Sequence, residues 1–382
     1  MYRKTVLVVM AAFALALVVA VPAWAMGPSH SGHRHHAPKV LFVQTNQPSG
    51  NQIAVYDRHR DGTLSFKAAY ATGGNGGVAA GAPSDPLASQ GSLVTAEHGR
   101  VLLAVNAGSD TVSVFALRDD RLKLRQVISS GGSFPASIAV RGDLVYVMNS
   151  GGVGRLQGYW LSGERLYAIG GSGRSLGLAN ATPPNFLTSP GQVGFSPDGS
   201  RLIVTTKASG SQIDVWRVRY NGRLSDDPVK NASTSPVPFA FAFDRHGRLI
   251  SIEAAMGQLS TYDVKRDDTL VGAGTTTSNG QTALCWIAFA RGFYFGTNTG
   301  SNTISSFRVA HDGTPTLVAA VAATTDTGPT DMAVSADQRY LYVQGGAAGS
   351  VDVFHVGWNG SLTRIQTVMG LPTLIEGIAA IG

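Results

Sequence analysis

Residues 101–115 read VLLAVNAGSDTVSVF, an apolar run, a turn rich in Gly and Ser, and a run that ends in an aromatic residue. The first five residues form a short apolar strand, and the residues from Thr111 to Phe115 alternate polar with apolar side chains. Asn106 lies at the turn, where its short amide bonds nearby backbone and tolerates left-handed dihedral angles. The stretch therefore predicts two consecutive antiparallel strands with a structural Asn between them.

The same unit recurs along the chain. Seven predicted strands, spaced 45 to 59 residues apart, end in an aromatic residue: Tyr56, Phe115, Trp160, Trp216, Tyr262, Phe307 and Phe354. A four-stranded propeller blade uses about 40–50 residues, and propellers have about 4–8 blades. We therefore predict an all-β fold, a seven-bladed β-propeller with four-stranded blades, over residues 39–382.

The remaining strands of each blade have their own signals. Asp-Gly or Asn-Gly pairs, such as Asp61-Gly62 and Asn221-Gly222, predict the hairpins that lead to outer strands. The chain begins with a second strand, Val40 to Thr45, and ends with an innermost-type strand, Gly377 to Ile381. We expect these two segments to complete one blade and close the ring, because closure removes the free strand edges.

The first 25 residues are typical of a signal peptide. Arg3 and Lys4 precede an apolar run, and Ala23-Trp24-Ala25 matches a small-x-small cleavage site. A retained membrane anchor is the alternative, and the Pro and the Ala-x-Ala site favour cleavage. We expect a secreted or periplasmic protein with residues 1–25 as signal peptide, 26–38 as a flexible His-rich leader, and no membrane span after cleavage.

Composition excludes several classes of function. The chain has a formal net charge of +6, but its basic residues are scattered, which argues against a nucleic-acid surface. Cys285 is the only cysteine, so no internal disulfide forms, and we interpret it as a small core residue. No metalloprotease, nucleophile-elbow or dinucleotide motif is found, and we expect a monomer without cofactor or metal.

Innermost strands begin beside the central channel, on the face that also carries the connections between blades. Four polar residues fall at or near comparable points there and form a predicted ring at the channel mouth: Gln192, Gln281, Asp331 and Glu376. Such a ring suits a small polar ligand, and a solvated channel lip is the alternative.

Two further charges occupy the position of Asn106 in adjacent blades. Lys207 and Glu253 each lie nine residues before the blade's aromatic residue. An ion pair between blades is the favoured interpretation, and a substrate clamp with a general base is the alternative.

Two connections between blades are unusually long, Ala71 to Ser89 and Gly170 to Ser189. Long loops in a compact domain often cover a functional site, and a tolerated surface insertion is the alternative. Their polar candidates are Asp85, Arg174 and Asn185.

The repeat resembles the lactonase family of seven-bladed propellers, which includes 6-phosphogluconolactonases and carboxymuconate-lactonising enzymes. The resemblance covers nearly all of residues 39–382 and is carried by stretches such as Ser89-Gln90-Gly91-Ser92-Leu93 and Pro238-Phe239-Ala240. It implies the propeller fold and, more weakly, lactone chemistry, since the repeat itself is scaffold.

The chain departs from the family at the positions that carry chemistry. The resemblance places a family His at Gly191, a family Arg at Phe239 and a family His at Ala240, while the family's Glu matches Glu253. Lactone hydrolysis needs groups that stabilise an oxyanion and move protons.

Two functions therefore stay open. The first is an enzyme that hydrolyses or forms a small lactone, with Glu253 as base and Lys207 or Arg174 as electrostatic partner. The second is a non-catalytic propeller that binds a carbohydrate, envelope component or protein through its loops. Buried, mutually positioned charges in a closed pocket would favour the enzyme, and a shallow, wet channel mouth would favour the binding protein.

Overall fold

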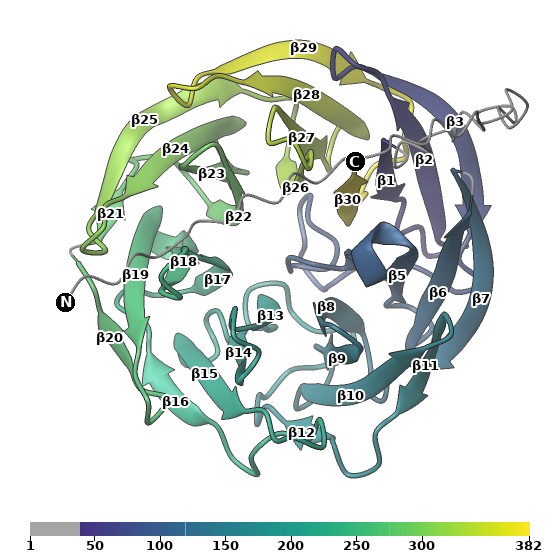
Figure 1. Cartoon of the computed structure of the whole chain (residues 1–382), viewed down its shortest axis with the longest axis vertical. Coiled ribbons are helices and arrows are strands. Elements are labelled where there is room, and N and C mark those ends of the chain that lie inside the picture. The colour runs from purple at the N-terminus through teal and green to yellow at the C-terminus, as the bar shows by residue number, and fades with distance from the viewer. Residues whose placement is uncertain (1–38, 119, 275) are drawn as a thin grey trace, which may run out of the picture. The chain divides into compact units, whose positions relative to one another are not determined.

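The computed structural model describes residues 39–118, 120–274 and 276–382, which form a seven-bladed β-propeller (Figure 1). The blades surround a central axis, with innermost strands such as β13, β22 and β26 towards the middle and β3, β7, β25 and β29 on the rim (Figure 1). The predicted fold class is confirmed. The predicted signal peptide and leader lie outside the described residues.

Each blade is an antiparallel sheet of four strands, which follow one another from the innermost outwards. The first blade contains β30 (Ile378–Ile381), β1 (Val40–Gln44), β2 (Gln52–Arg58) and β3 (Leu64–Ala71). The second contains β4 (Leu93–Ala96), β5 (Val101–Asn106), β6 (Thr111–Arg118) and β7 (Arg121–Ser129). The third contains β8 (Pro135–Arg141), β9 (Leu144–Asn149), β10 (Arg155–Ser162) and β11 (Arg165–Ala168). The fourth contains β13 (Gln192–Phe195), β14 (Arg201–Thr205), β15 (Gln212–Arg217) and β16 (Val229–Ala232).

The other three blades follow the same order. The fifth contains β17 (Pro238–Phe243), β18 (Leu249–Glu253), β19 (Gln258–Val264) and β20 (Leu270–Gly272). The sixth contains β22 (Leu284–Ala290), β23 (Phe293–Asn298), β24 (Thr303–Val309) and β25 (Pro315–Thr324). The seventh contains β26 (Pro329–Val334), β27 (Tyr340–Gly345), β28 (Ser350–Val356) and β29 (Leu362–Val368). Short strands β12 (Arg174–Ser175) and β21 (Thr277–Ser278) extend β10 and β19, and the 3-10 turns are η1 (Glu97–Gly99) and η2 (Ala254–Met256).

The ring closes as the sequence predicts. β30 pairs antiparallel with β1, with Val40 opposite Ile381 and Val43 opposite Ile378. The C-terminal strand thus supplies the innermost strand of the first blade, and β1 has a hydrogen-bonded partner on both sides.

Packing between blades buries the apolar faces of the second and third strands. Six of the seven aromatic residues that mark the repeat are buried, all except Trp160, which is 40% exposed. The β9–β10 hairpin has one residue more than β5–β6, so Tyr159 takes the buried place. Side chains alternate along a strand, and a shift of one residue therefore turns Trp160 outward.

The two ends of the propeller differ. The loop face is the end where the inner strands begin and where the connections between blades lie. The turn face is the opposite end, where the inner strands end in tight turns such as residues 244–247. Throughout the described residues, no helix has the length and apolarity needed to cross a membrane.

Candidate functional site

The two long connections meet over the loop face, on the side of the fourth to sixth blades. Ala80 donates a backbone hydrogen bond to Pro184 O (2.8 Å), and Phe186 donates one to Ala80 O (3.1 Å). The two loops are thus bound to each other, although about one hundred residues separate them in the sequence.

A pocket of about 340 Å³, the loop-face pocket, lies beneath these loops. Its floor comes from the loop-face ends of the fourth, fifth and sixth blades. Its walls are mostly apolar, with Phe239 and Trp286 packed edge to face at 5.0 Å between ring centroids. Its ionisable lining side chains are Asp85, Lys207 and Cys285. This combination of an apolar concave site with a few buried ionisable groups is typical of a small-molecule site.

Lys207 holds both loops to the fourth blade. Its side chain is buried, and Nζ donates hydrogen bonds to Ala88 O (2.6 Å), Phe186 O (2.5 Å) and Ser189 Oγ (2.9 Å). Nζ also lies 5.1 Å from the centroid of the Phe239 ring. All three ammonium protons therefore have partners, and the positive charge is held at the edge of the pocket.

Burial lowers the pKa of Lys207 to about 8, and the nearby Asp85 charge opposes that change. The ammonium form therefore predominates at neutral pH. Burial also raises the pKa of Cys285 to about 12, so this side chain is a thiol and not a nucleophilic thiolate near pH 7.

Asp85 and Glu376 form a buried carboxyl pair behind the pocket wall. Burial raises the pKa of both groups, and a hydrogen bond between the two side chains further raises that of Glu376 while lowering that of Asp85. Glu376 also accepts the Leu87 amide (2.7 Å), and Asp85 accepts the Ala88 amide (2.6 Å). Glu376 therefore keeps the shared proton, and Asp85 is the more acidic member and the one that lines the pocket.

The predicted polar ring at the channel mouth is present only in part. Gln192 and Asp331 line a common cavity along the central channel. Glu376 lies buried beside Asp85, and Asp331 acts on its pKa as a further neighbouring charge. Gln281 is not part of this group, because its Oε1 accepts a hydrogen bond from Thr303 Oγ1 at the β24 hairpin. Gln281 lies in the loop that leads from β21 to the innermost strand β22.

The predicted ion pair between Lys207 and Glu253 is wrong, because the structure places no such bridge between these two described residues. Glu253 lies four residues after Leu249, which pairs with Tyr262, whereas Lys207 lies five residues after Leu202, which pairs with Trp216. The two offsets differ by one residue, and successive side chains along a strand point to opposite sides of the sheet. Glu253 and Lys207 therefore lie on different sides of their blades. The equal spacing of nine residues therefore conceals different positions.

Glu253 instead occupies the ladder position of the structural Asn residues. Asn298 Nδ2 donates to Ser305 Oγ, seven residues later (2.9 Å). Glu253 Oε2 accepts from Ser260 Oγ at the same spacing (2.8 Å), and Oε1 accepts from Ser233 and Tyr262. Burial raises the pKa of Glu253. The carboxyl group joins β18 and β19 of its own blade to Ser233, which directly follows β16 of the fourth blade, and Glu253 is not among the residues that line the loop-face pocket.

Arg174 lies on the outer side of the propeller. Its guanidinium donates to Ser225 O (2.7 Å) and Leu224 O (2.8 Å) and pairs with Asp226. Asn185 caps its own loop by accepting the Leu187 amide (2.9 Å). Of the three loop candidates, the structure therefore brings Asp85 alone to the pocket.

The positions to which the resemblance assigns catalytic residues are apolar or too small in this chain. A Cβ at Gly191 would lie 2.5 Å from Phe239 O and 2.9 Å from Thr205 Oγ1, so no larger residue fits. Ala240 is fully buried, and Phe239 forms part of the pocket wall. The sequence indicated this loss, but the pairing of Asp85 with Glu376 was missed, because 291 residues separate the two.

Comparison with known proteins agrees with the fold. The family model described as "Lactonase, 7-bladed beta-propeller" matches residues 271–376. No curated protein matches the sequence. A putative 6-phosphogluconolactonase from Bacteroides fragilis has a TM-score of 0.70 at 17% identity, over 92% of this chain and 99% of that chain.

Two other solved structures are similar over most of their length. A periplasmic gluconolactonase from Pseudomonas aeruginosa has a TM-score of 0.67 at 17% identity, over 89% of this chain and 99% of that chain. A hypothetical selenium-binding protein from Sulfolobus tokodaii has a TM-score of 0.64 at 11% identity, over 91% of this chain and 94% of that chain. Identities this low support a shared fold alone. With the family match over residues 271–376, the seven-bladed fold confirms that this chain resembles the lactonase family of β-propellers.

Proposed function

We propose that this protein hydrolyses a small lactone in the loop-face pocket. The observation that carries the proposal is the buried, hydrogen-bonded pair of Asp85 and Glu376 beside the Lys207 ammonium, at the wall of a covered apolar pocket. Perturbed carboxyl groups in such a pocket are candidates for general acid–base work. This arrangement favours the enzyme over a propeller that binds its partner at a shallow, wet channel mouth.

The pair supplies the proton transfers of hydrolysis. Asp85, as carboxylate, accepts a proton from a water molecule while the water oxygen bonds to the lactone carbonyl carbon. The tetrahedral intermediate then breaks the ring C–O bond, and Asp85 returns the proton to the leaving ring oxygen. The product is a hydroxy acid. The positive charge of Lys207 stabilises the oxyanion through space, since its three protons are used elsewhere.

The lining also limits the substrate. Lys207 is the one cationic residue among those that line the pocket, and its hydrogen bonds are already made. A phosphate or a polyhydroxylated sugar acid would lose hydrogen bonds to water without replacement. The pocket therefore favours a compact, uncharged and largely apolar lactone over the phosphorylated sugar lactone that the names of some similar structures imply.

A panel of lactones tests this proposal. We expect turnover of an alkyl- or aryl-substituted δ-lactone to exceed that of a phosphorylated sugar lactone. Asp85→Asn keeps the acceptor for Ala88 but removes the base, and should lower kcat by about 10²–10⁴-fold. Glu253→Gln is the matched control, because Glu253 is a buried carboxyl group outside the pocket. The same variant tests the role as general base that the sequence suggested for Glu253. Absence of turnover on every lactone, or loss of turnover in Glu253→Gln with Asp85→Asn unaffected, would refute the assignment.

Export is part of the same proposal. The basic start, apolar run and Ala-x-Ala site of residues 1–25 support secretion or a periplasmic location. The measurement is N-terminal sequencing of protein recovered outside the cytoplasm, with Met26 expected as the first residue. Protein that retains Met1 and fractionates with membranes would contradict it.

A further inference from the structure

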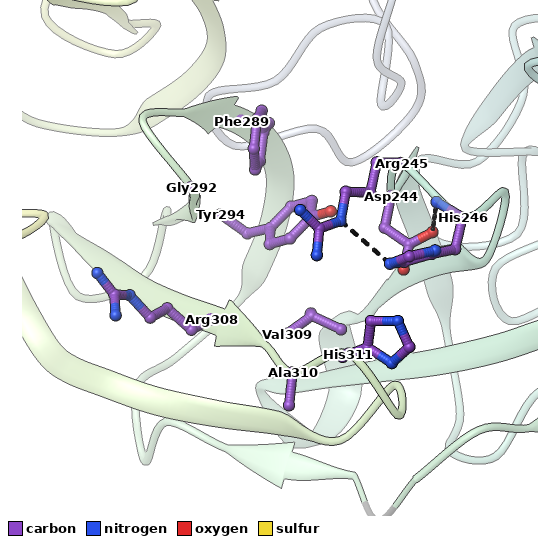
Figure 2. Close-up of a pocket in the computed structure, with 10 residues that line it drawn as sticks. All are labelled: Asp244, Arg245, His246, Phe289, Gly292, Tyr294, Arg308, Val309, Ala310 and His311. Atoms are coloured by element: carbon purple, nitrogen blue, oxygen red, sulfur yellow. Dashed lines mark hydrogen bonds between the residues drawn. The ribbon is translucent and has the colours of Figure 1, made fainter.

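A second cavity, the turn-face cavity, lies on the turn face between the fifth and sixth blades, and Figure 2 shows its lining. It has a volume of about 340 Å³. Its residues come from the turn after β17, from the β22–β23 turn and from the end of β24. The loop-face pocket is formed by the opposite ends of these blades, so the two sites are separate.

The turn-face cavity is positively charged. Arg245, His246, Arg308 and His311 line it, and Asp244 is the one acidic lining residue. Asp244 is already engaged, because it pairs with Arg248 (3.2 Å) and accepts the amides of His246 and Arg248. Its charge is therefore neutralised within its own turn. Arg308 lies against the Phe293 ring (4.2 Å) and points away from the histidines (Figure 2). Among the described lining residues, Arg245, whose Nε donates to His246 (3.1 Å), is therefore the guanidinium on the histidine side of the cavity.

One hydroxyl, that of Tyr294, opens into the turn-face cavity and has no hydrogen-bond partner among the described residues. Tyr294 is 3% exposed, and its side chain lines the cavity beside Phe289 and Arg245 (Figure 2). Among the hydrogen bonds between described residues, none involves its hydroxyl. Burial raises the pKa of Tyr294, so the group is a hydrogen-bond donor throughout the neutral range. A hydroxyl that opens into a basic cavity can donate to an acceptor atom of a ligand.

The same wall also presents aromatic surface to the cavity. The Phe289 and Tyr294 rings lie 4.9 Å apart between centroids at 53°, and Phe289 is 43% exposed. An exposed ring beside a guanidinium suits a ligand with both a flat apolar part and an anionic group.

We propose that the turn-face cavity binds a small aromatic carboxylate, with the carboxylate at Arg245 and the Tyr294 hydroxyl and the ring against Phe289. The two imidazoles, 4.7 Å apart between centroids, border the same space. A metal ion is a poorer fit, since the described residues contain no cluster of three or more His, Cys, Asp or Glu side chains and Arg245 donates Nε to His246 (3.1 Å).

Isothermal titration of the purified protein with benzoate tests this site. We expect saturable binding that is at least fivefold tighter than binding of acetate, because acetate lacks the ring. Arg245→Gln should weaken benzoate binding by about tenfold, and Tyr294→Phe by about threefold, since each removes one donor. Arg339→Gln, at the comparable turn of the seventh blade, is the matched control and should leave binding unchanged.

Several outcomes would overturn the proposal. Inorganic phosphate that binds more tightly than benzoate would show that the site recognises charge alone. If Arg245→Gln and Arg339→Gln weaken benzoate binding equally, the protein attracts the anion through its overall positive charge and not through this cavity. Zn²⁺ binding that needs His246 and His311, without benzoate binding, would make the site a metal site. Electron density for benzoate in the loop-face pocket and not in the turn-face cavity would place it in the other site. None of these results depends on lactone turnover.

Discussion

Replacing Asp331 by Asn should make the protein more stable at neutral pH. The Asp331 carboxyl is 3% exposed beside the central channel, and its Oδ1 accepts the Met332 amide (2.8 Å). Burial, together with the Asp85 charge, raises its pKa from 3.8 to about 7. The folded protein therefore favours the neutral acid, which Asn imitates in shape and hydrogen bonding.

The direction and the size of the change in unfolding free energy follow from the raised pKa of Asp331. A carboxyl whose pKa is raised in the folded state contributes stability that is complete below pH 3.8 and is lost as the pH rises through about 7. At about 1.4 kcal/mol for each pH unit, the loss amounts to about 4 kcal/mol. Asn does not titrate. The variant should therefore match the parent near pH 4 and exceed it by about 4 kcal/mol in unfolding free energy at pH 8.

Urea unfolding at 25 °C, followed by tryptophan fluorescence at several pH values, measures this difference. Asp198→Asn is the control, because hydrogen bonds from Ser196 and Ser200 help to lower the pKa of Asp198 to about 2, and its effect should not change between pH 5 and 8. A stability difference between Asp331→Asn and the parent that is constant with pH, or a variant that is weaker at pH 8, would refute the reasoning.

Three other predictions concern the architecture of the site. Lys207→Met removes three hydrogen bonds to the covering loops, so hydrogen exchange in residues 79–89 and 180–189 should accelerate; unchanged exchange would contradict the clamp. Gly191→Ala places a Cβ 2.5 Å from Phe239 O and should lower the unfolding free energy by about 1–3 kcal/mol, and an unaltered Tm would show that the site adapts. Deletion of residues 374–382 removes β30 and exposes the edge of β1, so we expect aggregation or loss of cooperative unfolding, whereas a monomer with the parent's Tm would argue against closure by this strand.

The propeller itself was predictable from the sequence. Apolar runs, Gly-rich turns and alternating strands are local signals, and their repetition determines the blade count and the four-stranded blades. The closing pair of β1 and β30 was also predictable, because each terminal segment matches a different strand of the same repeat. That Gly191, Phe239 and Ala240 carry no polar side chain, where the resemblance expects His and Arg, was likewise visible in the amino-acid sequence.

Which residues meet at the loop-face pocket was decided by the tertiary structure. Counting nine residues to an aromatic placed Lys207 and Glu253 together, but one residue of difference in hairpin length turned their side chains to different sides of their blades. Asp85 and Glu376 meet because the long first loop folds over the end of the chain, and the second loop is fastened over the same pocket by Lys207. No local pattern encodes such contacts. Within a blade, each strand pairs with the strand next to it in the sequence, so a local repeat is enough to specify the blade. The pocket is formed by irregular loops, and their positions follow from packing between segments that are far apart in the sequence.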